Sequence, residues 1–296
     1  MKKIWCTIGI LCIVFIIMIG RAQMKIDSEQ IKKIDENYIK LRSADFMQRY
    51  SAVNYFIQIK MEALDQKIRN ELVDRFIREA EQLGKYERLS YKPGMTRERL
   101  PKEMLYITTG EAFVQYFSRL CRLVAKSNDP RVVPLLVEHC QDPKLLISFG
   151  ELAVDPFINQ AKTSDIPGKR SNALRGLSYM LEDKKDAYVA SGAIRDKIMK
   201  TLIESAISDK DHLVRSVVVK ALGDTGDRDA IPVLEKIAQT DPYHLETKAV
   251  AGIDKDVAPG QPINRYTVRL TAQEAIKKIR EGKKRNDLIV KEIFIK

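Results

Sequence analysis

The chain has 296 residues, with 51 Lys and Arg against 40 Asp and Glu, and 45% of its residues are hydrophobic. This is a globular composition, which excludes collagen-like, low-complexity and intrinsically disordered proteins and leaves one or two domains or an elongated array. The three histidines, His139, His212 and His244, are scattered, and no two of the four cysteines form a Cys-x-x-Cys pair. We therefore predict no metal site, no cofactor and no thioredoxin-type redox centre.

The first residues have the order of a secretory signal. Two lysines precede a charge-free apolar run over residues 4–19, which Gly20-Arg21-Ala22 follows. We predict a signal peptide over residues 1–22, cleaved after Ala22, and hence an exported protein that is periplasmic or secreted. The alternative is an uncleaved inner-membrane anchor over residues 4–20, because the run nearly reaches the roughly 17 residues that span a bilayer. Cleavage would leave 48 basic and 40 acidic residues, a net charge of +8.

Residues 23–89 show apolar side chains at steps of three and four, without a proline, which predicts an amphipathic helical segment. The alternative, a coiled-coil dimer, requires a sustained heptad that these steps do not hold. Residues 90–109 contain Pro93-Gly94, Pro101 and several basic side chains, and they predict a basic linker.

Helix-length apolar segments separated by short breaks follow over residues 110–281 and indicate a repeat. Its clearest unit is residues 209–238, where we expect Asp211 to cap a first helix and Asp229 a second. Between them, Gly223 is expected to end the first helix and Gly226 to relieve the turn. Pro232 falls in the first turn of the second helix, where a missing N–H costs little.

This unit resembles a HEAT repeat of the bacterial type, with its D-x-x-V-R and A-L-G-x-x-G-D lettering; residues 129–136 form a weaker copy of its second half. The repeat-defining positions are Asp129, Pro134, Asp211, Val214, Arg215, Ala221, Leu222, Gly223, Gly226, Asp229 and Pro232. The resemblance implies an all-α fold: a right-handed α-solenoid of HEAT-like hairpins over residues 110–281, preceded by the amphipathic segment. Residues 282–296 would form a C-terminal tail.

Cys121 and Cys140 would be the only cysteines left after cleavage. We expect Cys121 within one helix and Cys140 at the end of the next, in a hairpin that turns near Asn128. The predicted hairpin would allow a disulfide between them, but we favour the interpretation that they are two buried structural thiols.

The sequence lacks the phosphate-binding, dinucleotide-binding, nucleophile-elbow and zinc-protease motifs, so we predict a protein that is not an enzyme. The Asp224-Thr225-Gly226 triplet also occurs in aspartic proteases, but here it lies between two helices and has no second copy. An accessory role like that of the chromophore lyases is the weakest alternative, because the shared repeats also occur in many non-enzymes.

We expect a protein-interaction scaffold of the cell envelope, whose partner is an acidic protein or another envelope protein. A membrane-anchored assembly factor and contact with a membrane surface are the alternatives. We do not expect nucleic acid, because acidic residues interrupt the basic ones and no aromatics interleave with them. The expected partner contacts are Arg131, Arg175, Arg215, Lys220 and Arg269. In HEAT-like repeats the arginine after the valine often ties adjacent turns together, so Arg215 and Arg269 have a scaffold role as their alternative.

Overall fold

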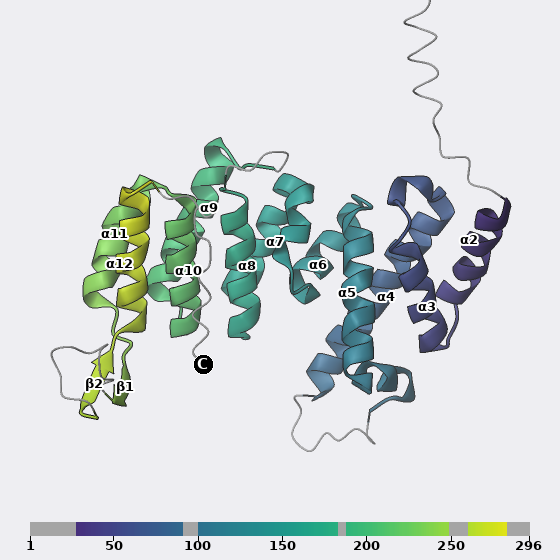
Figure 1. Cartoon of the computed structure of the whole chain (residues 1–296), viewed down its shortest axis with the longest axis horizontal. Coiled ribbons are helices and arrows are strands. Elements are labelled where there is room, and N and C mark those ends of the chain that lie inside the picture. The colour runs from purple at the N-terminus through teal and green to yellow at the C-terminus, as the bar shows by residue number, and fades with distance from the viewer. Residues whose placement is uncertain (1–27, 91–99, 183–187, 249–259, 283–296) are drawn as a thin grey trace, which may run out of the picture. The chain divides into compact units, whose positions relative to one another are not determined.

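A computed structural model of the chain describes residues 28–90, 100–182, 188–248 and 260–282 (Figure 1). The predicted signal peptide or anchor and nearly all of the predicted C-terminal tail lie outside these ranges. Within them, no helix combines the length and the apolar character that crossing a membrane requires. The described chain divides into two compact units, residues 1–60 and 61–296.

The fold is all-α, as predicted, and forms a helical-repeat solenoid. The α-helices are α2 (Ser28–Leu41), α3 (Phe46–Phe56), α4 (Gln66–Ser90), α5 (Glu111–Ala125), α6 (Val133–His139), α7 (Val154–Thr163), α8 (Pro167–Tyr179), α9 (Gly192–Ser208), α10 (His212–Thr225), α11 (Ile231–Thr240) and α12 (Thr267–Arg280). The 3-10 helices are η1 (Met61–Ala63), η3 (Lys102–Thr109), η4 (Pro130–Val132), η5 (Pro143–Ala153) and η6 (Arg228–Ala230).

The first unit contains α2 and α3, which pack against each other. The side chain of Asp45 accepts a hydrogen bond from the backbone N–H of Gln48 at 3.0 Å and so caps α3. Ala52, Val53 and Phe56 form the buried side of α3. Both helices lie within the predicted segment 23–89, and the boundary between the units falls inside that segment, after Lys60.

In the second unit, α4 and α5 pack through aromatic side chains. The ring centroids of Phe76 and Phe117 lie 5.7 Å apart, as do those of Phe113 and Phe117. The predicted linker is partly wrong, because residues 102–109 form η3, which packs on α4 and α5 and buries Met104 and Ile107. These two apolar side chains give the segment a core contact that a solvated linker would lack.

Two rows of helices form the rest of the second unit (Figure 1). In one row α10 packs between α8 and α12; in the other α7, α9 and α11 pack against α8, α10 and α12 respectively. We call the first row the α8–α10–α12 layer. Tight packing between the rows depends on Gly176, because a Cβ atom there would lie 2.4 Å from the ring of Phe157.

A short antiparallel hairpin interrupts the helices between α11 and α12. It consists of β1 (Leu245–Lys248) and β2 (Pro262–Arg265), with Leu245 opposite Arg265. The sequence predicts no strands in this part of the repeat region. Four-residue strands with mostly exposed side chains carry too little apolar alternation to be predicted from sequence.

Candidate partner-binding surface

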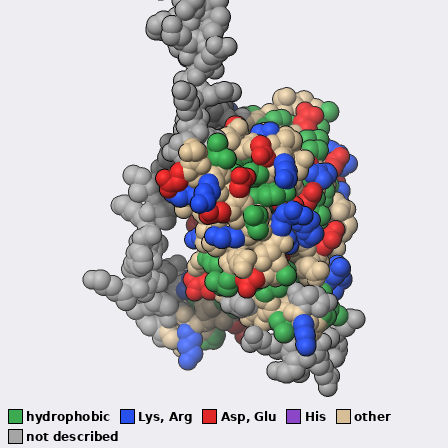
Figure 2. Space-filling model, turned by 90° about the vertical axis from the view of Figure 1, so that its right-hand side faces the viewer, with side chains coloured by type: hydrophobic (Ala, Val, Ile, Leu, Met, Phe, Trp, Pro, Cys, Tyr) green, Lys and Arg blue, Asp and Glu red, His purple; other side chains and the backbone are tan. Residues whose placement is uncertain are grey.

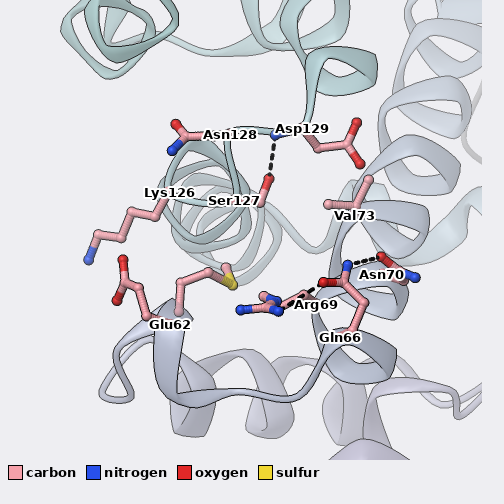
Figure 3. A pocket seen from close by; sticks show the side chains of 10 residues that line it. Glu62, Gln66, Arg69, Asn70, Val73, Lys126, Ser127, Asn128 and Asp129 are labelled. Carbon is pink, nitrogen blue, oxygen red and sulfur yellow. Dashed lines mark hydrogen bonds between the residues drawn. The ribbon is translucent and has the colours of Figure 1, made fainter. Parts of the chain in front are cut away.

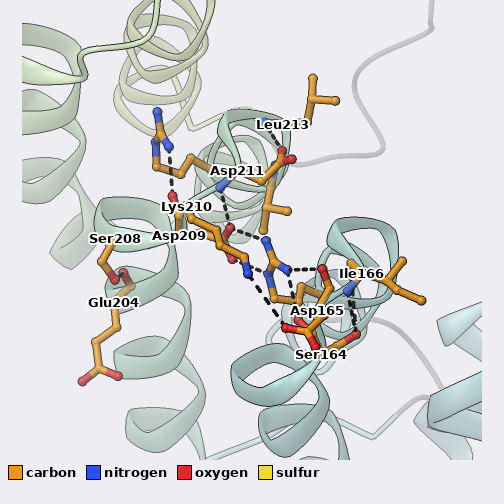
Figure 4. A network of polar contacts seen from close by, with 12 residues as sticks. Ser164, Asp165, Ile166, Glu204, Ser208, Asp209, Lys210, Asp211 and Leu213 are labelled. Atoms are coloured by element: carbon orange, nitrogen blue, oxygen red, sulfur yellow. Dashed lines mark hydrogen bonds and ion pairs between the residues drawn. The ribbon is translucent and has the colours of Figure 1, made fainter. Parts of the chain in front are cut away.

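Buried arginines fix the α8–α10–α12 layer. Nε and Nη2 of Arg170 donate to the two carboxylate oxygens of Asp209, both at 2.8 Å, and its Nη1 donates to the carbonyl of Ser164 at 3.0 Å. The Arg170 and Asp209 side chains are 4% and 7% exposed. The guanidinium thus ties the residues before α8 to those before α10 (Figure 4).

Arg215 repeats this arrangement one hairpin later. Its Nε and Nη2 donate to the carboxylate of Asp241 at 2.7 and 3.1 Å, and its Nη1 donates to the carbonyl of Asp209 at 2.9 Å. Arg269 then donates from Nε to the carbonyl of Asp241 at 2.7 Å. These three arginines and two aspartates form a continuous arginine ladder that holds successive first helices in register.

The ladder shifts the protonation equilibria of its members. Burial by itself raises the pKa of Asp209, but hydrogen bonds from Arg170 and from the backbone N–H of Asp211 outweigh it and hold the pKa below the ordinary value. The hydrogen bond to Asp209 raises the pKa of Arg170. Both shifts favour the charged forms, so the buried pair remains ionic at neutral pH.

The structure separates the five predicted partner contacts. Arg215 is a ladder residue whose side chain is 9% exposed, so it is not available to a partner; its alternative scaffold role is the correct one. Arg269 also serves the ladder, and its guanidinium carbon lies 4.1 Å from the ring centroid of Tyr266. Arg131 is half-exposed and forms ion pairs with Asp129 at 2.8 Å and Asp74 at 3.1 Å.

Arg175 and Lys220 lie on the exposed side of the same layer. Each follows its ladder arginine by five residues, as Glu274 follows Arg269, so the three side chains occupy equivalent positions on α8, α10 and α12. Arg175 donates to the Tyr179 hydroxyl at 3.1 Å. The layer therefore presents a row with two basic groups and then one acidic group.

A groove of about 510 Å³ follows this row between α10 and α12. Gly223 and Ala275 let the helices approach closely, because a Cβ on Gly223 would lie 2.7 Å from the Cβ of Ala275. Polar and charged side chains surround these two residues: Ser216, Lys220, Asp224, Thr271, Glu274, Lys277, Lys278 and Glu281. Lys278 pairs with Asp224 at 2.5 Å, which leaves Lys220 and Lys277 as the groove's more exposed basic groups.

Most repeat-defining residues have the predicted local roles. The Asp211 carboxylate accepts from the backbone N–H groups of Leu213 and Val214, and Asp129 accepts from that of Arg131. Gly226 ends α10 in the left-handed conformation, with φ of 70°. Three further residues are buried and two prolines occupy first helical turns, as expected: Val214, Ala221, Leu222, Pro134 and Pro232.

Two predicted roles are wrong. Gly223 does not end α10, which continues to Thr225; it provides the close contact with Ala275. Asp229 does not cap the second helix either. The chain enters α11 through the short 3-10 helix η6, and Asp227 caps η6 by accepting from the backbone N–H of Asp229 at 3.0 Å. The N-cap residue of α11 itself, Ala230, makes no side-chain cap.

Sequence reasoning also missed a ladder-like arginine in the first unit. Arg49 lies four residues after the cap Asp45, as Arg215 lies four residues after Asp211, and its Nη1 donates to the carbonyls of Ser43 and Ala44 at 3.2 and 2.7 Å. Arg49 and Arg215 share an aspartate four residues earlier in the chain, whereas the ladder residues Arg170 and Arg269 do not.

A smaller, polar pocket of about 220 Å³ lies between the start of α4 and the turn after α5 (Figure 3). Gln66 donates to Asn70 at 2.7 Å and accepts from Arg69 at 2.8 Å, and Ser127 accepts from the backbone N–H of Asp129 at 3.2 Å. These contacts satisfy the side chains locally, and we assign the pocket no ligand.

One cluster has the composition of a cation site. Ligand atoms of Glu87, Glu138 and His139 lie within 4.8 Å of one another. The ammonium of Lys169, however, lies 2.9 Å from Glu87 and already supplies the positive charge that a metal ion would bring. We therefore assign no metal here.

The charges on the face of the molecule in Figure 2 are mixed. Basic and acidic side chains alternate over its coloured part, and apolar ones lie among them. A surface of this kind lacks the single-sign area that phosphate backbones require.

The comparisons with known proteins agree with the helical repeats. No curated protein matches the chain. Residues 154–253, which begin at α7 and end after β1, match the family model for HEAT repeats. This segment contains the ladder residues Arg170, Asp209, Arg215 and Asp241, and the match supports the assignment of these helix pairs to the HEAT repeats, which generally mediate protein–protein interaction.

Proposed function

We propose that the chain is a non-catalytic scaffold that binds a protein partner along the exposed side of the α8–α10–α12 layer. The observation that carries this proposal is the arginine ladder. Because buried ion pairs fix the three helices, the exposed groups Arg175, Lys220 and Glu274 keep a constant spacing. Binding a partner therefore costs little conformational entropy in the backbone of this surface.

The chemistry of this row favours a partner with acidic side chains opposite Arg175 and Lys220 and a basic one opposite Glu274. The groove beside it has space for a side chain or a short segment of the partner. Its small residues, Gly223 and Ala275, lie at the closest approach of α10 and α12. This arrangement suits an ordinary protein surface better than a uniformly charged polymer.

The partner is testable by site-specific photo-crosslinking in the native host. A crosslinker at Lys220 is expected to give one stoichiometric adduct, which mass spectrometry then identifies. Lys236 on α11 is the matched control, since it is also an exposed lysine of a repeat but does not line the groove. Equal crosslinking from both positions would contradict the proposal. So would an adduct at position 220 that is undiminished in a chain that also carries Arg175→Glu.

We also propose that the scaffold works outside the cytosol, in the cell envelope. The support is the order of the first 22 residues: two lysines, an apolar run and small residues at Gly20 and Ala22. Intact mass of the protein recovered from fractionated cells tests this. A soluble species that begins at Gln23 supports export with cleavage, and full-length protein in washed membranes supports the anchored assembly factor. Full-length protein in the cytosol excludes both.

A further inference from the structure

Cys121 and Cys140 face one another in the second unit. Cys121 lies in the C-terminal half of α5 and is 1% exposed, whereas Cys140 follows the last residue of α6 and is partly exposed. Both are free thiols, they line the same cavity, and each shifts the pKa of the other. The chain brings them together by turning at Asn128, whose φ is 54°.

The two thiols have different surroundings. Cys140 caps α6 in an extended conformation, and its Sγ donates to the carbonyl of Asp142 at 3.5 Å. Both thiols border a cavity of about 520 Å³ between α4, α5 and α6, which Arg122 also lines. A small thiol or disulfide therefore has space beside the sulfur atoms, and Cys140 is the one that solvent reaches.

We infer that Cys121 and Cys140 form a redox-active dithiol that small disulfides, or the exposed disulfide of an oxidoreductase, convert into an internal disulfide. This inference does not depend on the proposed partner surface. It goes beyond the sequence-based expectation of two inert structural thiols, because the shared cavity brings both cysteines together and their unequal exposure gives each a role.

Cys140 is the attacking thiol. The interaction with Cys121 lowers the pKa of Cys140, and burial opposes it. The backbone hydrogen bond with Asp142 and the charge of Arg122 also lower this pKa, whereas the charge of the Asp142 carboxylate raises it. The Cys140 thiolate attacks one sulfur of the external disulfide, forms a mixed disulfide and expels the first small thiol.

Cys121 is the resolving thiol. Its hydrogen bond with Cys140 and its burial hold its pKa well above the ordinary value, so it does not react first. After the mixed disulfide forms, Cys121 loses its proton to solvent and attacks Sγ of Cys140, which expels the second small thiol. The protein loses two electrons and two protons, and the external disulfide becomes two thiols.

The product would join α5 to the end of α6. This bond closes a loop through the turn at Asn128 and limits the unfolded chain, so oxidation is expected to raise Tm by about 5 °C or more. It also fixes the position of the segment 140–142 relative to α5.

The test uses the full-length chain with Cys6→Ser and Cys12→Ser, so that only this pair remains, and oxidised glutathione as the probe. Peptide mapping is expected to show Cys121 joined to Cys140, the loss of two hydrogen atoms from the intact mass, and no attached glutathione. Protein that stays reduced, or that carries glutathione on both cysteines, overturns the inference.

Two variants test the order of attack. Cys121→Ser is expected to accumulate one glutathione on Cys140, and Cys140→Ser is expected to stay unmodified while folded. Equal labelling of the two folded variants overturns the assignment of roles. Because serine in the core at position 121 can unfold the chain, Cys121→Ala is measured in parallel, with circular dichroism to establish folding and labelling in urea as the control in which either thiol reacts.

Discussion

The α4–α5 pair and the α8–α10–α12 layer both bury charged side chains, but they satisfy them differently. In the layer, Arg170 and Arg215 meet carboxylates that lie one hairpin further along the chain. Between α4 and α5, the 2% exposed Glu79 accepts hydrogen bonds from the hydroxyls of Tyr106 and Tyr116 at 2.5 and 3.0 Å. The arginine–aspartate pairs recur in successive repeats, whereas the hydrogen bonds from tyrosines to Glu79 occur only at this position.

This difference explains where the HEAT match lies. A ladder contact needs the same residues at the same place in each hairpin, so it leaves a recurring sequence pattern, and the match covers residues 154–253. The α4–α5 pair depends on large aromatic rings instead, such as Phe76 and Phe117. α4 and α5 therefore form a packed helix pair that lies outside the matched segment.

The largest expected effect is the loss of a ladder arginine. Arg215→Met leaves the 4% exposed carboxylate of Asp241 without its guanidinium, and we expect the free energy of unfolding to fall by about 3–5 kcal/mol. Urea denaturation followed by circular dichroism measures it. The control Arg175→Met removes an exposed arginine from the same layer and is expected to change stability by less than about 0.5 kcal/mol. Equal losses in the two variants would show that the ladder is not what holds the layer.

The corresponding change between α4 and α5 is Glu79→Ala. It leaves the hydroxyls of Tyr106 and the fully buried Tyr116 without this acceptor, and we expect a loss of about 1–3 kcal/mol. Glu79→Gln keeps an acceptor oxygen and is expected to cost less. The exposed Glu81 on the same helix is the control, and its replacement by alanine is expected to be nearly neutral in the same denaturation experiment. Equal losses in Glu79→Gln and Glu79→Ala would mean that the charge of Glu79, which lies 3.8 Å from Arg75, dominates over the hydrogen bonds.

The helices of the repeat region were predictable from sequence because their determinants are local. Asp211 precedes its helix, Pro232 lies in a first turn, and Val214 and Leu222 recur with helical period. The row of exposed groups was predictable only in part. Arg175 and Lys220 are exposed as expected, whereas Arg215 faces inward because Asp241, 26 residues away in the chain, supplies its counter-ion.

Other features depend on contacts between distant residues or on backbone conformation. Gly223 is predicted to end a helix because glycine is common at helix C-termini, but in the structure it lies inside α10 and contacts Ala275 on α12. Asp227 and Asp229 are equally good caps by residue type. Only the extended conformation of Asp227, with φ of −76° and ψ of 119°, decides between them.

The close approach at Gly223 gives a smaller test of the layer. In Gly223→Ala the added Cβ would lie 2.7 Å from the Cβ and 2.8 Å from the Cα of Ala275, so α10 and α12 must separate, at a cost of about 1–3 kcal/mol. Gly168→Ala on α8 is the matched control, because nothing lies within 4 Å of a Cβ there. Thermal unfolding of both variants measures the difference. A neutral Gly223→Ala would mean that the two helices are not held at this distance.

The smallest expected effect distinguishes the two aspartates before α11. Asp227→Ala removes the acceptor for the backbone N–H of Asp229 and the ion pair with Arg195, and we expect a loss of about 1 kcal/mol. Asp229→Ala changes an exposed side chain that caps nothing, so its loss should stay within about 0.5 kcal/mol.

Asp227→Asn separates the two contributions, because asparagine caps a helix as well as aspartate does but forms no ion pair. Stability close to the wild type in Asp227→Asn would assign the effect to the cap, and stability as low as in Asp227→Ala would assign it to Arg195. A larger loss in Asp229→Ala than in Asp227→Ala would reverse the assignment of the cap itself.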